Sequence, residues 1–210
     1  MTTLVIIAKE CLPGRVKTRL HPDLSLEQAA EAAAASLADT FAALAGLPAE
    51  GRILAFDGIV APAGSEPYDV IPQAPGDLDE RLAAVFDAAE GPTILVGMDT
   101  PQLRAADLAP FFPWPEHAED ADFVFGPALD GGFWCLGMSK PRGDLIRGVP
   151  MSRDDTGAQQ LGRLCAAGGG IRMLPPLIDV DTIVEARAVA ALAPDTRFAR
   201  TLSSMIGVAA

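Results

Sequence analysis

Short apolar runs alternate with longer amphipathic segments along this chain. Residues 4–7, 93–96 and 123–125 are rich in β-branched and aromatic side chains. Such runs are typical of strands that are buried on both faces of a sheet. Seven runs in all predict strands, at residues 4–7, 52–56, 68–72, 93–96, 123–125, 133–138 and 171–174.

Between these runs, apolar residues recur at helical spacing. The longest such segment begins at Ser25, where Gln28 three residues later forms a capping box, and one face stays apolar through Leu44. Thr182 and Glu185 form a second capping box and predict the start of another helix. The predicted helices span residues 25–44, 78–86, 105–112, 155–167 and 183–192, with one more short helix after residue 196.

Strands that alternate with helices predict an α/β fold, in which helices cover both faces of a sheet to give a three-layer α/β/α arrangement. The chain has 210 residues, half of them hydrophobic, which is enough for one sizeable core. It contains no repeat, low-complexity stretch or evident linker. We therefore expect a single domain over residues 1–210.

The net charge and the cysteines indicate which kinds of binding partner and which cellular compartment to expect. A net charge of −12 argues against a basic face for nucleic acid. The first apolar run is too short for a signal peptide, and the alanine-rich helix carries Glu31 and Asp39, so no membrane segment is expected. Cys11, Cys135 and Cys165 lack metal-site spacing. We expect a cytoplasmic protein with free thiols, in which Cys11 fills space.

Within this acidic chain, a cluster of cations follows the first predicted strand. Lys9, Arg15, Lys17 and Arg19 surround a loop that contains Gly14. In an open α/β sheet, ligands bind at the carboxyl ends of the strands, so these cations predict a phosphate-binding loop. A solvated basic loop is the alternative. The glycine-rich phosphate-binding motifs G-x-G-x-x-G and G-x-x-x-x-G-K-[ST] are both absent from this loop. We therefore expect side chains to hold the phosphate.

Carboxylates follow other predicted strands. Asp99 comes just after the run at residues 93–96, and Asp179 and Asp181 precede the last long helix. Carboxylates at one sheet edge can hold a divalent cation that bridges phosphate oxygens. The alternatives are an Asx turn at Asp99 and helix-capping roles for the other two. We expect Asp99 to bind the metal, with Asp179 or Asp181 as the second ligand.

Two further features point to ligand contacts. Arg81 lies in the first turn of a predicted helix, where a cation opposes the helix dipole, and this favours contact with an anion. Asp130 is followed by Gly131 and Gly132, which permit close approach of the backbone to a ligand. The alternative for this triplet is a tight turn between strands.

Five motifs occur in order along the chain: A-K-x-x-x-P-G-x-V-K-T-R-L, G-D-L-x-E-R-L, G-x-D-T-P-x-L, G-P-x-x-D-G-G-F and D-V-D-T. Together they resemble the DUF2064 family of small transferases with the nucleotide-diphospho-sugar transferase (GT-A) fold. That family is similar to 2-phospholactate guanylyltransferases and molybdenum-cofactor nucleotidyltransferases. The resemblance runs from residue 4 to about residue 192 and implies a mostly parallel mixed sheet.

The resemblance also implies roles for individual residues. Lys17 and Asp99 would be catalytic, and Asp99 and Asp181 would hold Mg²⁺ or Mn²⁺. The acceptor or the donor group would lie against Asp130, Gly131, Gly132 and Ser152. The nucleotide-binding residues would be Lys9, Gly14, Arg15, Lys17, Arg19, Gln73, Gly76 and Arg81.

These residues predict a metal-dependent transferase that acts on a nucleotide-activated donor and a small-molecule acceptor. The family label and the Asp-Gly-Gly turn favour transfer of a sugar from a nucleotide-diphospho-sugar. Nucleotidyl transfer with release of pyrophosphate is the alternative, because Asp99 is not part of a D-x-D motif and the cationic loop suits a triphosphate. A nucleotide-binding module without turnover is the second alternative. The sequence does not specify the base, the sugar, the acceptor or the oligomeric state.

Overall fold

The computed structural model describes residues 2–114 and 121–207, which fold around one seven-stranded sheet. The strand order is β3-β2-β1-β4-β6-β5-β7, and only β6 runs antiparallel to its neighbours. All seven predicted strands are confirmed, with small shifts at their ends. They are β1 (Thr3–Lys9), β2 (Gly51–Asp57), β3 (Asp69–Pro72), β4 (Thr93–Val96), β5 (Phe123–Pro127), β6 (Phe133–Met138) and β7 (Ile171–Met173).

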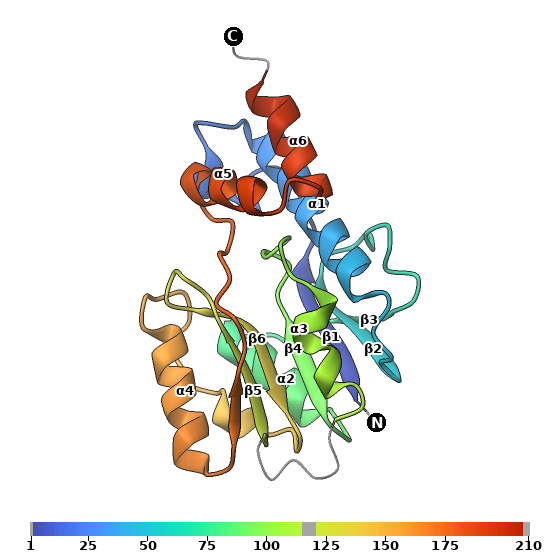
Figure 1. The fold of residues 1–210 in the computed structure, drawn as a ribbon, viewed down its shortest axis with the longest axis vertical. Helices are drawn as coiled ribbons and strands as arrows, with labels where there is room; N and C mark the ends of the chain where they lie inside the picture. Colours follow the sequence, from blue (N-terminus) through green and yellow to red (C-terminus); the bar gives the residue numbers. More distant parts are fainter. Residues whose placement is uncertain (1, 115–120, 208–210) are drawn as a thin grey trace.

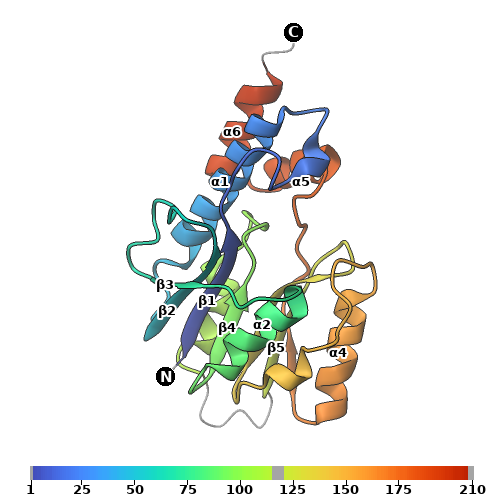
Figure 2. The same ribbon diagram turned by 180° about the vertical axis from the view of Figure 1, so that it is seen from behind.

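Helices cover both faces of this sheet (Figures 1 and 2). Helices α1 (Leu26–Leu44) and α3 (Ala105–Leu108) pack against one face. Helices α2 (Leu78–Asp87) and α4 (Thr156–Ala167) pack against the other. The predicted three-layer α/β/α arrangement with a mostly parallel mixed sheet is confirmed.

The local signals predict most helix boundaries correctly. Both capping boxes form: Ser25 and Gln28 exchange hydrogen bonds at the start of α1, and Thr182 and Glu185 do so before α5. The prediction of one helix over residues 105–112 is partly wrong. Helix α3 ends at Leu108 and a 3₁₀ turn follows, because Pro110 has no N–H with which to continue the α-helical ladder.

A third hydrophobic cluster lies beyond the end of the sheet. Helices α5 (Ile183–Leu192) and α6 (Arg197–Ile206) pack there against the first half of α1. Phe198 is fully buried at its centre. Residues 174–182, the β7–α5 connection, lead from the sheet to this cluster, which lies near the carboxyl ends of the parallel strands (Figure 1).

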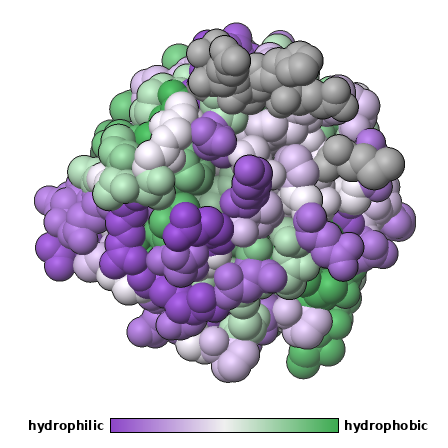
Figure 3. Space-filling view, turned by 90° about the horizontal axis from the view of Figure 1, so that it is seen from below, coloured by the Kyte–Doolittle hydropathy of each residue, from purple (hydrophilic) through white to green (hydrophobic). Residues whose placement is uncertain are grey.

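The carboxyl ends of the six strands that run in one direction therefore meet at a single edge, next to the third cluster. The amino ends of these strands lie at the opposite end of the molecule, which Figure 3 shows from below with hydrophilic and hydrophobic residues interspersed. No helix among the described residues combines the length and the apolar character needed to cross a bilayer.

Candidate functional site

A cavity of about 830 Å³ opens at the carboxyl edge of the sheet. This volume lies within the usual range for a small-molecule site. Gly14, Arg15 and Gly131 do not line it. The other sequence-predicted site residues do: Lys9, Lys17, Arg19, Gln73, Gly76, Arg81, Asp99, Asp130, Gly132, Ser152 and Asp181, together with Asp179.

Lys17 forms the centre of this cavity's charge arrangement. Its Nζ lies 3.0 Å from Asp99 Oδ2 and 3.0 Å from Asp181 Oδ1, and only 8% of its side chain is exposed. Burial alone would lower the pKa of Lys17, but the two carboxylates outweigh it and hold this pKa above its usual value. The loop lysine is thus neutralised by carboxylates that are distant from it in the sequence, Asp181 by 164 positions.

The two carboxylates of this cluster are brought together by backbone hydrogen bonds. Val180 N donates to Asp99 O at 3.0 Å, which places Asp181 directly beside the loop after β4. Gln102 Nε2 strengthens the same junction by donating to Ile178 O at 2.7 Å. Sequence reasoning missed Gln102, because an amide in a loop gives no pattern that identifies a distant carbonyl as its partner.

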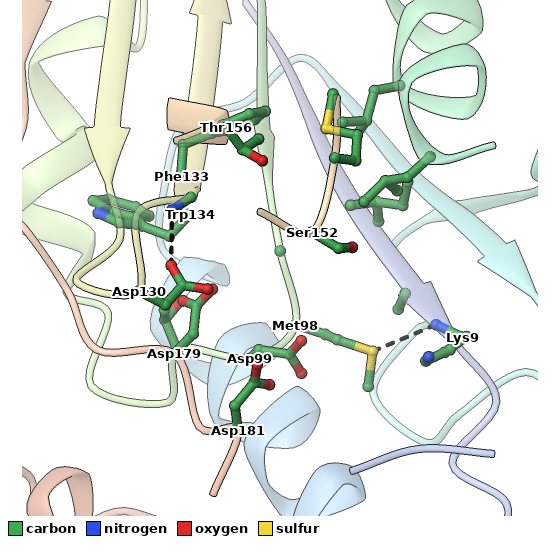
Figure 4. A pocket seen from close by; sticks show the side chains of 18 of the residues that line it. Lys9, Met98, Asp99, Asp130, Phe133, Trp134, Ser152, Thr156, Asp179 and Asp181 are labelled. Carbon is green, nitrogen blue, oxygen red and sulfur yellow. Dashed lines mark hydrogen bonds between the residues drawn. The ribbon is translucent and has the colours of Figure 1, made fainter. Parts of the chain in front are cut away.

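A second pair of carboxylates lies near the first (Figure 4). Asp179 Oδ1 is buried and makes no hydrogen bond within the described parts of the chain. Burial, followed by the charges of Asp99 and Asp130, raises the pKa of Asp179 to about 7. Asp130 Oδ1 accepts from Gly132 N at 2.8 Å, which fixes the turn. Of the four carboxylates, only Asp99 and Asp181 form ion pairs with Lys17 among the described residues.

Asp99 and Asp181 are the two carboxylates that could hold a divalent metal ion. Asp99 Oδ2 and Asp181 Oδ1 are at most about 6 Å apart, because each lies 3.0 Å from the same nitrogen. No group of three or more His, Cys, Asp or Glu in residues 2–114 and 121–207 has the arrangement of a metal site. Two carboxylates agree with Mg²⁺, which keeps few protein ligands and completes its shell with phosphate and water. Carboxylate oxygens also suit Mn²⁺.

The other end of the cavity contains a network around Arg81. Its Nη1 lies 3.2 Å from both Asp57 Oδ2 and Gln73 Oε1, and its Nε donates to Gly76 O at 2.9 Å. The predicted cation at the helix start is therefore already paired with a carboxylate. Sequence reasoning did not assign Asp57 to the site, although its place directly after the predicted strand at residues 52–56 is the kind of signal that identified Asp99.

The Asp-Gly-Gly turn packs closely against the start of α4. Gly131 has φ +92°, and a Cβ atom there would lie 1.9 Å from Asp154 O. Gly157 N donates to Gly131 O at 2.7 Å. The close approach at Gly131 is therefore to protein backbone, whereas Gly132 lines the cavity. This contact holds Ser152 and the start of α4 in the cavity wall.

Comparison with known proteins supports the family resemblance and the fold. The family model described as "Uncharacterized protein conserved in bacteria (DUF2064)" matches residues 32–153. No curated protein matches the chain. A proposed nucleotide-diphospho-sugar transferase from Desulfovibrio desulfuricans G20 has a similar structure, with a TM-score of 0.82 and 22% identity over 99% of this chain and 97% of that one.

More distant structures share the fold alone. One is 2-C-methyl-D-erythritol 4-phosphate cytidylyltransferase from Thermus thermophilus, with a TM-score of 0.53 and 14% identity over 92% of this chain and 100% of that one. Another is glucosyl-3-phosphoglycerate synthase from Mycobacterium tuberculosis, with a TM-score of 0.50 and 10% identity over 99% of this chain and 80% of that one. The sheet is thus of the nucleotide-diphospho-sugar transferase type, and because the family model covers more than half of the sequence, the chain belongs to the DUF2064 family.

Proposed function

We propose that this protein is a metal-dependent transferase that moves a sugar from a nucleotide-diphospho-sugar to a small acceptor. The observation that carries the proposal is the meeting of Lys17, Asp99 and Asp181 in a cavity at the carboxyl edge of the sheet. An ammonium group beside a metal-binding carboxylate pair suits a diphosphate, whose oxygens need both kinds of positive charge.

The donor nucleotide would occupy the part of the cavity between β1 and α2. Lys9, Lys17 and Arg19 contribute positive charge to this part, and the Arg81 network forms its far wall. A divalent ion on Asp99 and Asp181 would add the positive charge that neutralises the phosphate oxygens.

The transferred sugar and the acceptor would lie against Asp130, Gly132 and Ser152. An acceptor hydroxyl oxygen would bond to the anomeric carbon as the bond from that carbon to the diphosphate breaks. The hydroxyl proton would pass to water or to a cavity carboxylate. Lys17 and Arg19 would stabilise the charge that develops on the departing nucleoside diphosphate, so the chain would act by positioning and charge stabilisation.

Nucleotidyl transfer is the second candidate, and two observations favour it. Asp99 is followed by Thr100 and Pro101, so the chain lacks a D-x-D motif at this position. Strand β1 and the loop after it supply three cations to the cavity, Lys9, Lys17 and Arg19, and this grouping suits the charge of a triphosphate. In that reaction an acceptor oxygen would attack the α-phosphorus, and pyrophosphate would leave.

A product assay separates these candidates. The purified protein would be incubated with Mn²⁺ or Mg²⁺, with nucleotide-sugars or nucleoside triphosphates, and with pooled small acceptors. We expect a nucleoside diphosphate to appear, and Asp99→Asn to abolish it while retaining cooperative unfolding. Pyrophosphate alone would establish nucleotidyl transfer instead. Neither product, together with a rise in Tm on adding nucleotide, would indicate a binding module without turnover.

A further inference from the structure

The Lys17 ammonium lies between the two carboxylates that would hold the metal. Both distances, to Asp99 Oδ2 and to Asp181 Oδ1, are 3.0 Å, and the lysine side chain is almost fully buried. A cation that binds both carboxylates has to approach each oxygen to about 2.0–2.6 Å. The ammonium and the metal therefore compete for the same space and the same negative charge.

The backbone at Lys17 indicates that this placement is imposed by its surroundings. Lys17 has φ 47° and ψ 36°, in the left-handed region that non-glycine residues seldom adopt. Such a conformation persists only where surrounding contacts hold it. The two ion pairs and the bond from Leu20 N to Lys17 O, at 2.9 Å, are the contacts that hold it here.

Phosphate offers the ammonium an alternative partner. Lysine binds phosphate oxygens as a point charge, and Lys9 and Arg19 line the same cavity, where a polyphosphate would enter. If metal and phosphate bind together, the metal replaces the Lys17 ammonium as the partner of the two carboxylates. The ammonium then pairs with the phosphate instead of the carboxylates. Every charge then keeps an opposite partner.

We propose that Lys17 is an internal counter-ion that lies between the two metal-binding carboxylates and excludes a divalent cation from them until nucleotide phosphates draw it away. This inference rests on the proposed function for its nucleotide and adds that metal and nucleotide bind interdependently. The protein would bind free Mn²⁺ weakly and the metal–nucleotide complex tightly. Binding of one partner would raise the affinity for the other by the same factor.

Titration of Mn²⁺ in the absence of nucleotide, with free Mn²⁺ measured by electron paramagnetic resonance, tests this competition. We expect Lys17→Met to bind Mn²⁺ at least ten-fold more tightly than the wild type. Lys9→Met is the matched control, because Lys9 lines the same cavity yet forms no ion pair among the described residues. Its affinity for Mn²⁺ should stay within about two-fold of the wild type.

Mn²⁺ affinity in Lys17→Met that is equal to or weaker than that of the wild type would overturn the proposal. A gain in Mn²⁺ affinity in Lys9→Met as large as that in Lys17→Met would also overturn it, because it would reveal a general effect of removing positive charge. Adding a non-hydrolysable nucleoside triphosphate should tighten Mn²⁺ binding more in the wild type than in Lys17→Met. If Lys17→Met fails to unfold cooperatively, Lys17→Gln, which removes the charge but keeps a polar side chain, replaces it with the same expectation. Because Mn²⁺ binding requires no turnover, this test can fail while the product assay succeeds, and the reverse.

Discussion

Arg15 and Arg19 are both exposed cations of the loop after β1, yet only Arg19 lines the cavity. Its Nη1 lies 3.2 Å from Asp181 Oδ2. We predict that Arg19→Ala weakens nucleotide binding by roughly 1.5–3 kcal/mol, the range for a charge-assisted hydrogen bond. Stability should change by less than about 1 kcal/mol, because the pair is solvent-exposed.

Arg15→Ala is the matched control for this prediction, since it removes the same charge from the same loop outside the cavity. Calorimetric titration with a nucleoside diphosphate should show affinity unchanged from the wild type in Arg15→Ala and reduced in Arg19→Ala. Equal losses in the two variants would mean that both arginines reach the phosphates, as the sequence alone suggests.

Cys11 lies in the loop after β1, where its surroundings disfavour the thiolate form. Burial, followed by the negative charge of Asp99, raises the pKa of the Cys11 thiol to about 11. Because the thiolate is the reactive form, we predict slow alkylation of Cys11 at pH 8, with a rate that increases as the pH approaches 11. The exposed Cys165 is the internal reference. Mass spectrometry of iodoacetamide-treated protein measures both, and comparable labelling at pH 8 would contradict the prediction.

At the residue scale, the sequence identifies candidates but not their partners. Asp99 could be singled out because it follows an apolar run, and Lys17 because its loop follows a strand. Asp181 was preferred to Asp179 only through the family resemblance. The ion pairs among them could not be predicted, because they join positions that only the fold brings together. The left-handed backbone of Lys17 gave no signal either, since glycine is the usual residue there.

The turn between β5 and β6 and the helix α4 fit together through Gly131. We predict that Gly131→Ala lowers the free energy of unfolding by at least about 1–2 kcal/mol, the cost of a left-handed backbone for a residue with a Cβ. The new Cβ would also overlap Asp154 O. Gly162→Ala within α4 is the control: a Cβ there meets open space, and alanine should stabilise the helix by roughly 0.5–1 kcal/mol.

Urea unfolding of these two glycine variants measures both effects on one scale. Similar free energies of unfolding for Gly131→Ala and Gly162→Ala would contradict the close packing of the turn on α4. From the sequence, the Asp-Gly-Gly triplet predicts a tight turn or a close approach of the backbone to a neighbour. The sequence does not identify that neighbour, which the structure shows to be the start of α4.

Among the elements, the buried strands were the easiest to predict, because their apolar runs are short and bounded by turn residues. The 3₁₀ turns at Thr18–Leu20 and Gly143–Leu145 were not predicted, since three residues are too few to show a period. The family resemblance predicted a mostly parallel mixed sheet. It did not give the order of the strands or identify β6 as the antiparallel strand. Local sequence does not specify pairing between strands that are distant along the chain.

For the whole molecule, the β7–α5 connection joins the sheet to the third hydrophobic cluster and carries Asp181. Gln102 holds it through the bond to Ile178 O. We predict that Gln102→Met lowers the free energy of unfolding by about 1 kcal/mol, the net value of one hydrogen bond. Nucleotide affinity should also fall, because Asp181 is held less firmly beside Asp99.

Gln159→Met is the matched control for this variant. Gln159 is also half-buried and donates to Asp155 Oδ2 at 2.7 Å, but it does not line the cavity. Its replacement should affect stability without changing nucleotide affinity. Calorimetric titration measures the nucleotide affinity of both variants, and chemical denaturation measures their stability. Equal nucleotide affinities in Gln102→Met and Gln159→Met would show that the bond to Ile178 is not needed to place Asp181.

The contact between Lys17 and Asp181 also affects when the site can form during protein synthesis. A ribosome makes the loop of Lys17 early and the β7–α5 connection late, and helix α6, which covers α1, later still. A nascent chain that stops before residue 177 would contain Lys17 and Asp99 but would lack Asp181 and the cover of α1. Nucleotide binding would therefore begin only after the β7–α5 connection has been made, so affinity for nucleotide would distinguish chains that include this connection from chains truncated before it.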